Sequence, residues 1–408
     1  MNVIVIGGGP SGILAAANAK NDFNTVTLFD GNEKLGKKLY ITGKGRCNVT
    51  NNCLPQDFLS NVVSNSKFLY SGIYSFSPQD TIDLIESMGT KLKTERGNRV
   101  FPVSDKASDI IKALSTYAKN NGVDIKLEHL VKSVKKEGDT FEVVTNKGRF
   151  FADIVVVACG GKSYPTTGST GFGYEIAKSF GHHIVDIKPA LVPIDLKKYN
   201  KNLAGLSLKN VKATVKVEGQ EFSEFGEMLF THTGVSGPIV LSLSSKINRL
   251  DLKGAKFVVD LKPALSESQL DDRLIRDFQS YLNKDFKNYL PELMPKSLID
   301  EFLTRLSFEQ DKKVNSITKE NRAEIINILK NFSFEILNLQ PVELGIITAG
   351  GVDTKEISPK TMESKLVSNL YFVGEVLDLD AVTGGFNIQI ALSTGYLAGQ
   401  DISQKYGG

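Results

Sequence analysis

The sequence predicts an α/β protein whose parallel sheet is built from both ends of the chain, with a second domain inserted between them. The first observation is a strand–helix–strand pattern, in which residues 2–6 and 25–30 are apolar runs and residues 11–21 are rich in alanine. The second is that similar apolar strands return at residues 150–158 and 369–373. The third is a change of character from about residue 191, where alternating strands and then a helical pattern begin.

The remaining elements of the first domain follow from local signals. Residues 77–88 are predicted to form a helix, because Ser77 is a good N-cap and proline follows it at the first helical position. Residues 106–120 have the pattern of an amphipathic helix. The other predicted elements of this domain are strands at residues 123–127, 131–136 and 141–145, and a final helix at residues 387–398.

The inserted α+β domain is predicted to span residues 191–344, which leaves residues 1–190 and 345–408 for the first domain. Its first part, residues 191–262, alternates in the manner of strands and is expected to be barrel-like. Its second part, residues 265–337, is expected to be helical and opens with a capping-box signal at Ser266 and Gln269.

The composition excludes several classes of protein. Lysine and arginine total 49 against 46 aspartate and glutamate, so no global charge announces a nucleic-acid or membrane partner. No apolar run approaches the roughly 20 residues of a membrane helix. Three cysteines over 408 residues do not make a disulfide framework and fit a reducing cytoplasm. Cys47 and Cys53 have no histidines nearby to complete a zinc site, so no metal is expected.

A glycine pattern lies between the first strand and the first helix. Gly7 permits a tight turn, Gly9 lets a diphosphate approach the backbone, and Gly12 lets helix and strand pack closely. The helix that contains Ser11 supplies free N–H groups to the phosphates. Asp30 ends the second strand, where an acidic side chain binds the adenosine ribose. These residues predict a Rossmann-like dinucleotide-binding domain, although the motif alone does not choose between NAD and FAD.

Six further segments favour FAD over NAD, because together they resemble a known family of proteins. They are GKKLYITGKGRCNVTN at 36–51, ACGG at 158–161, THTGVSGP at 231–238, TAGGVD at 348–353, YFVGEVLD at 371–378 and GGFNIQ at 384–389. Together they resemble a bacterial flavoprotein family of aminoacetone-oxidase-like proteins that also contains a ribosomal-RNA dihydrouridine synthase. The likeness runs nearly end to end and implies a glutathione-reductase-like FAD-binding domain.

The resemblance also implies where FAD is held. Glu375 ends an apolar strand where related flavoproteins bind the ribityl chain, and Asp378 is the second candidate for that contact. The helix after Gly385 is expected to direct its first N–H groups at the pyrimidine edge of the flavin. Basic residues between 37 and 46 are placed to meet the diphosphate or an anionic substrate. The predicted FAD contacts are Gly7, Gly9, Ser11, Gly12, Asp30, Lys37, Gly45, Arg46, Asn48, Val131, Ala158, Gly160, Gly374, Glu375, Asp378, Gly385, Phe386, Asn387 and Ile388.

Three activities are compatible with this resemblance. The favoured one is reduction of a uridine in 23S ribosomal RNA to dihydrouridine with NAD(P)H, which needs hydride from the flavin and a general acid. Cys47 and His232 are the candidate acids, and Arg46 is the third candidate catalytic residue. The alternatives are oxidation of a small amine by oxygen, for which a chain without tryptophan offers no clear aromatic cage, and a non-catalytic FAD-containing assembly protein.

One local signal favours an RNA partner. A row of lysines has only Asp195 and Glu218 as flanking acids and is placed to follow phosphates. Lysine-rich strands are also common at soluble sheet edges, so a purely structural role stays open. The row consists of Lys197, Lys198, Lys201, Lys209, Lys212 and Lys216.

Overall fold

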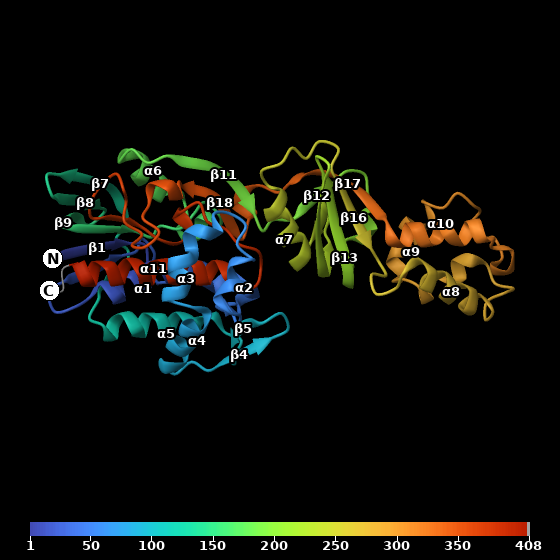
Figure 1. The fold of residues 1–408 in the computed structure, drawn as a ribbon, viewed down its shortest axis with the longest axis horizontal. Coiled ribbons are helices and arrows are strands. Elements are labelled where there is room, and N and C mark those ends of the chain that lie inside the picture. Colours follow the sequence, from blue (N-terminus) through green and yellow to red (C-terminus); the bar gives the residue numbers. More distant parts are fainter. Residues whose placement is uncertain (406–408) are drawn as a thin grey trace. The chain divides into compact units, whose positions relative to one another are not determined.

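A computed structural model describes residues 1–405 of the chain, which form two compact units (Figure 1). The first unit contains Met1–Ala190 and the chain from Pro341 onward, and the second contains Leu191–Gln340. The predicted insertion reached residue 344, whereas residues 341–344 belong to the first unit. The carbonyl oxygen of Glu343 there accepts a hydrogen bond from the backbone N–H of Tyr164 at 3.3 Å.

A five-stranded parallel sheet forms the centre of the first unit. Its strand order is β19 (Leu370–Phe372), β10 (Ile154–Val157), β1 (Asn2–Ile6), β2 (Thr25–Phe29) and β6 (Asp124–Lys126). The central strands are apolar and buried, as expected when helices or other layers cover both faces of a sheet. This arrangement confirms the predicted Rossmann-like domain built from both ends of the chain.

Helices α1 (Pro10–Ala19) and α11 (Phe386–Lys405) lie side by side in the first unit (Figure 1). Their backbones approach closely because α11 has glycine at the contact: a Cβ on Gly395 would lie 2.2 Å from the carbonyl oxygen of Ser11. Helix α11 extends well beyond the predicted residues 387–398 at its C-terminal end. The packing fixes α1 against the C-terminal segment, so both ends of the chain build one site.

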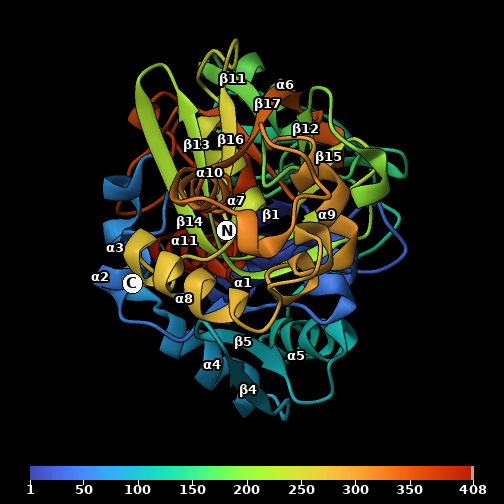
Figure 2. The same cartoon turned by 90° about the vertical axis from the view of Figure 1, so that its right-hand side faces the viewer.

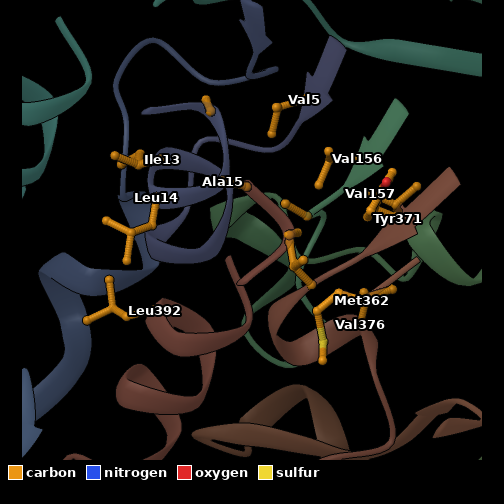
Figure 3. Packing of buried hydrophobic residues seen from close by; sticks show 14 of the residues in the cluster. Val5, Ile13, Leu14, Ala15, Val156, Val157, Met362, Tyr371, Val376 and Leu392 are labelled. Carbon is orange, nitrogen blue, oxygen red and sulfur yellow. The ribbon is translucent and has the colours of Figure 1, made fainter. Parts of the chain in front are cut away.

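The core of the first unit joins these helices to the sheet. Figure 3 shows the buried side chains of Ile13 and Leu14 from α1, Leu392 from α11, and Val156 from β10. Each is almost entirely removed from solvent. Burial of such aliphatic side chains contributes roughly 1.5–3 kcal/mol each relative to exposure, so this core holds the sheet edge in a fixed shape.

The remaining elements of the first unit surround this core. The small antiparallel sheets comprise β3 (Thr50–Asn51), β5 (Arg99–Pro102) and β4 (Leu92–Glu95), and β7 (Val131–Glu137), β8 (Thr140–Thr145) and β9 (Gly148–Ala152). The α-helices are α2 (Pro55–Leu59), α3 (Tyr70–Ser75), α4 (Pro78–Ser87), α5 (Ala107–Asn120) and α6 (Phe172–Ser179). Three 3₁₀ segments matter for the site: η1 (Lys37–Gly45), η8 (Val342–Leu344) and η10 (Gly374–Val376).

The predicted single strand at residues 150–158 is two strands. The chain leaves the antiparallel strand β9 at Ala152 and enters the parallel strand β10 at Ile154. Asp153 makes the turn, and its carboxylate accepts a hydrogen bond from the backbone N–H of Asn2 at 2.7 Å. The sequence hides this change of sheet because Asp153 is a single polar residue between two apolar runs, so the two strands were predicted as one.

An antiparallel ribbon connects the first unit to the second. Strand β11 (Ile184–Ala190) pairs with β18 (Ile347–Val352), and Ala190 stands opposite Ile347. The chain therefore leaves the first unit and returns to it at neighbouring positions.

The second unit contains a closed six-stranded barrel (Figure 2). Its strand order is β12 (Ile194–Leu196), β15 (Gly234–Ser236), β14 (Gln220–Phe230), β13 (Ser207–Val217), β16 (Lys256–Asp260) and β17 (Phe332–Leu339). The helices of this unit are α7 (Pro238–Ile247), α8 (Glu267–Phe278), α9 (Lys296–Leu303) and α10 (Lys319–Lys330). A barrel part and a helical part were both predicted, and both are present.

The predicted helical part was too long. It was expected to reach residue 337, but α10 ends at Lys330 and β17 follows, pairing with β16 and β12 to close the barrel. Phe332, Phe334 and Ile336 alternate with more exposed residues, which is the two-residue period of a strand. The predicted strand region 191–262 likewise contains a helix, α7, which starts with proline at its first position.

Among residues 1–405, no helix combines the length and the apolar character that crossing a bilayer would need.

His182 gives the first unit a pH-dependent stability. Its ring is buried between Glu356, 3.0 Å from Nδ1, and the Ser364 hydroxyl, 2.9 Å from Nε2. Burial lowers the pKa of His182 below its ordinary 6.5, although Glu356 opposes the shift. The folded protein therefore binds this proton less readily than the unfolded chain. Stability from this group is complete above pH 6.5 and falls as the pH drops toward the folded-state pKa.

We therefore expect the wild-type protein to lose more unfolding free energy than His182→Gln between about pH 7.5 and about pH 5.5. The difference in slope is at most about 1.4 kcal/mol per pH unit, the value for one proton. Urea denaturation at the two pH values measures it, and equal slopes for both proteins would contradict the assignment.

Candidate cofactor site

The turn between β1 and α1 contains glycines that the protein's own packing requires and one glycine that it does not. A Cβ on Gly7 would lie 2.3 Å from the carbonyl oxygen of Ala158, and one on Gly12 would lie 1.9 Å from the carbonyl oxygen of Gly7. The protein's own backbone therefore requires glycine at both positions. A Cβ on Gly9 would meet no protein atom within 4 Å. Gly9 faces open space at the N-terminus of α1, which is where a dinucleotide diphosphate binds in such folds.

Asp30 lies beside this turn, directly after β2. Its carboxylate accepts hydrogen bonds from the backbone N–H of Gly8 and of Asn32, each at 2.7 Å. Its backbone carbonyl accepts from the N–H of His129 at 2.9 Å, two residues before Val131 begins β7. The predicted ribose contact and the predicted contact at Val131 thus lie at the same edge of the sheet.

The C-terminal segments bring further glycines to this edge. Gly160 and Gly374 have φ values of 73° and 76°, and Gly385, at φ 98°, is so close to β3 that a Cβ would lie 2.3 Å from the carbonyl oxygen of Thr50. Helix α11 begins at Phe386, and Ile388 lies in its first turn. The side chain of Asn387 is engaged with Ala381, whose N–H and carbonyl it contacts at 2.9 and 2.8 Å. Its backbone, rather than its amide group, is left for the predicted contact.

Cys47 and Asn48 follow η1. The thiol of Cys47 is fully buried, and burial raises its pKa to about 12, so it is protonated at neutral pH. The side-chain oxygen of Asn48 is buried and has no hydrogen-bond partner in the described chain. Because buried acceptors are nearly always satisfied, this oxygen is suited to a donor from a bound molecule.

These features fit FAD. The open side of Gly9, the N–H groups at the start of α1, Asp30 and the unsatisfied oxygen of Asn48 provide what a dinucleotide needs at this edge of the sheet. When bound, FAD supplies redox chemistry by hydride or electron transfer.

Comparison with known proteins agrees with this geometry. The family described as HI0933-like protein Rossmann domain matches residues 1–401. The chain belongs to this family.

Sequence similarity to three relatives extends over nearly the whole chain. It is 32% identical over 98% of both chains to the 3-dehydro-bile acid delta(4,6)-reductase of Clostridium scindens. It is 31% identical, again over 98% of both chains, to the ribosomal RNA dihydrouridine synthases of Haemophilus influenzae and of Escherichia coli. The resemblance inferred from the sequence motifs is therefore confirmed.

Two solved structures share the fold. The 3-ketosteroid delta1-dehydrogenase of Sterolibacterium denitrificans has a TM-score of 0.54 at 13% identity over 99% of both chains. The 3-ketosteroid-delta4-(5alpha)-dehydrogenase of Rhodococcus jostii has a TM-score of 0.55 at 12% identity, over 98% of this chain and 96% of that one. The family match and the full-length reductase and synthase relatives, rather than these two structures, identify the chain as an FAD-dependent oxidoreductase, as predicted.

Lys38 is one of the basic residues between 37 and 46 that were expected to meet the diphosphate or an anionic substrate, but it was not among the predicted FAD contacts. Its ammonium donates hydrogen bonds to both carboxylate oxygens of Glu375, at 2.9 and 2.7 Å, and to the hydroxyl oxygen of Ser163, at 2.7 Å. Glu375 also accepts from the backbone N–H of Thr348 at 2.9 Å. This cluster of Lys38, Ser163, Thr348 and Glu375 ties η1, β18 and η10 together. The carboxylate of Glu375 is thus engaged by the protein, and its predicted ribityl contact stays a prediction.

Asp378, the second candidate for that contact, is buried and accepts a hydrogen bond from the side chain of Asn65 at 2.9 Å. Lys37 was also predicted to contact FAD. Its ammonium pairs with the carboxylate of Glu33 at 3.3 Å near the surface. Periodicity does not distinguish two adjacent lysines in an irregular 3₁₀ segment, and the predicted FAD contact at Lys37 stays a prediction.

Arg46 is held by acids of the β4–β5 region. Its guanidinium pairs with Glu95 and, at 2.7 Å, with Asp105, and it lies 4.1 Å from the centre of the Phe101 ring. These contacts account for Arg46 as a structural residue that anchors the loop carrying Gly45, and its catalytic and cofactor roles stay predictions.

His232 belongs to the second unit, whereas Cys47 and Arg46 belong to the first. It occupies the turn between β14 and β15, and its side chain is exposed. Hydrogen bonds between Thr231 and Gly234 close the turn, at 2.8 Å between their backbones and 3.1 Å from the Gly234 N–H to the Thr231 hydroxyl. The THTG segment is therefore a hydrogen-bonded turn in which His232 is exposed to solvent.

Proposed function

We propose that this protein reduces a carbon–carbon double bond conjugated to a carbonyl group, and that its substrate is a uridine of 23S ribosomal RNA. The observation that carries the proposal is the set of full-length relatives at 31–32% identity. Formation of dihydrouridine adds hydrogen to the double bond of a uracil ring, next to a carbonyl. A 3-dehydro-bile acid with double bonds at positions 4 and 6 presents the same conjugated group. NAD(P)H is the proposed source of electrons.

Such a reduction also needs a proton donor. Cys47 keeps its proton at neutral pH but lies in the core of the first unit, without exposed surface. His232 is exposed on a hydrogen-bonded turn, so a base taken out of its stack has access to it. We therefore favour His232 over Cys47 as the acid.

The lysine row offers a partial surface for RNA. Lys197 is paired with Glu335, and Lys216 is paired with Glu221 at 2.8 Å, so these two charges are neutralised. The other four lysines make no ion pair within residues 1–405 and are exposed, which suits contact with phosphates. These four are Lys198, Lys201, Lys209 and Lys212.

The test is nucleoside mass spectrometry of 23S ribosomal RNA from cells with and without the protein. We expect one dihydrouridine to be missing without it and to return with the wild-type gene. His232→Ala should bind FAD normally and restore the nucleoside at least about 100-fold more slowly, the usual effect of losing a general acid. His183→Ala, which changes an exposed histidine of the first unit, is the matched control.

Unchanged RNA would overturn the uridine substrate. Reduction of a small conjugated enone by the purified protein would then keep the reaction class and move the substrate toward the bile-acid type. Peroxide formation with an amine would instead support the oxidase alternative, and full complementation by His232→Ala would remove His232 as the acid.

A further inference from the structure

Tyr174 carries a buried hydroxyl group that has no partner in the protein. The residue lies in α6 and is 6% exposed. Its hydroxyl makes no hydrogen bond to any residue in the described part of the chain. Leaving such a group unsatisfied destabilises the fold, and buried tyrosines usually place the hydroxyl against a partner. A molecule outside the chain would remove this cost.

Helix α6, which carries Tyr174, packs at the ligand-binding edge of the sheet. The helix follows Gly171, whose φ is 88°, and Gly173 allows it to approach the strand ends. A Cβ on Gly173 would lie 2.7 Å from the side chain of Val376 and 3.2 Å from that of Cys159. Cys159 follows β10 and Val376 belongs to η10, so α6 packs against the carboxyl ends of parallel strands, where open α/β sheets bind ligands.

The charges around Tyr174 make its hydroxyl a donor. Burial raises the pKa of Tyr174 far above its ordinary value, and the carboxylates of Glu375 and Asp378 raise it further. The phenol is thus neutral and holds its proton for an acceptor. Glu375 and Asp378 are also the two residues predicted to lie near the ribityl chain.

We propose that Tyr174 is a cofactor-positioning residue whose hydroxyl donates a hydrogen bond to a ribityl oxygen of FAD. The acceptor would be an alcohol oxygen of the ribityl chain, which would give the Tyr174 hydroxyl the hydrogen-bond partner that it lacks within residues 1–405. The proposal rests on FAD binding alone and is independent of which substrate the flavin reduces.

Tyr174→Phe tests the proposal because it removes one oxygen atom and keeps the packed ring. In the apoprotein, the melting temperature should stay equal or rise, since an unsatisfied buried hydroxyl disappears. The dissociation constant for FAD should rise about tenfold, the effect of one lost hydrogen bond. Titration of apoprotein with FAD, followed by flavin fluorescence, measures it. The affinity for ADP, which lacks the ribityl chain, should not change.

The matched control is Tyr289→Phe in the second unit. Tyr289 is fully buried, but its hydroxyl donates to Asp277 at 3.0 Å. Its replacement should lower the melting temperature and leave FAD affinity unchanged. Three results would overturn the proposal for Tyr174: an unchanged dissociation constant for FAD, a less stable apoprotein, which would reveal a partner within the fold, or an equal loss of ADP affinity, which would assign the hydroxyl to the diphosphate.

Discussion

Alanine in place of Gly9 is expected to leave the apoprotein folded and to weaken FAD binding at least about 100-fold, or roughly 2.7 kcal/mol. The backbone of Gly9 has φ −78° and ψ 179°, which any residue adopts without strain. The added methyl group would meet no protein atom within 4 Å, so the fold has no reason to resist it. It would instead occupy the space through which the diphosphate approaches the N–H groups of α1. Fluorescence titration gives the affinity, and thermal melting of the apoprotein gives the stability.

Gly12→Ala is the contrasting variant. Its methyl group would lie 1.9 Å from the carbonyl oxygen of Gly7, so the strand and helix must separate. We expect this protein to be unfolded or strongly destabilised even without FAD. Wild-type FAD affinity in Gly9→Ala would show that the diphosphate does not bind at this turn.

The second large effect is expected for Lys38→Met. Lys38 and Glu375 are each only 19% exposed, and removal of the ammonium leaves a carboxylate in a poorly solvated place. Breaking a buried pair in this way costs about 3–5 kcal/mol, and the remaining exposure places the expected loss near the lower limit, about 3 kcal/mol. Urea denaturation of the apoprotein measures the loss.

A double-mutant cycle separates the pair from its surroundings. Lys38→Met with Glu375→Gln should be more stable than Lys38→Met alone, because the neutral amide still accepts from Thr348 without carrying a charge. Additive effects of the two substitutions would mean that the ion pair contributes nothing. Both variants are expected to bind FAD less tightly, since the cluster holds η10 against the site.

The sequence predicted those parts of the site that the backbone determines. Gly12 is required by a contact with Gly7 inside one strand–turn–helix unit, and Gly7 is required by the carbonyl oxygen of Ala158, but both stand in a local motif that is enough to find them. Lys38 and Tyr174 depend on partners or neighbours that are distant in the chain, and no local pattern reports on them. Lys38 is 337 residues from Glu375, and adjacent Lys37 has the same chemistry but pairs with Glu33.

In the fold, too, features set by neighbouring residues were predicted, and a feature set by long-range pairing was missed. The parallel strands and the capped helix after Ser77 follow from short-range apolar patterns and capping residues. Strand β17 was missed because it directly follows a helix, so that a single helical stretch was drawn through its alternating residues. Its partners β12 and β16 lie far earlier in the chain, and their pairing decides that the segment is a strand.

The ribbon of β11 and β18 has an evolutionary consequence. Ala190 and Ile347 stand opposite each other in an antiparallel pair, where Cα atoms are only about 4.5–5.5 Å apart. A tight hairpin is thus long enough to join β11 directly to β18 in place of the inserted segment. A segment of different shape needs only to begin and end at these two neighbouring strand ends. Sequence changes confined to the inserted segment therefore leave the dinucleotide-binding domain and its points of attachment unchanged.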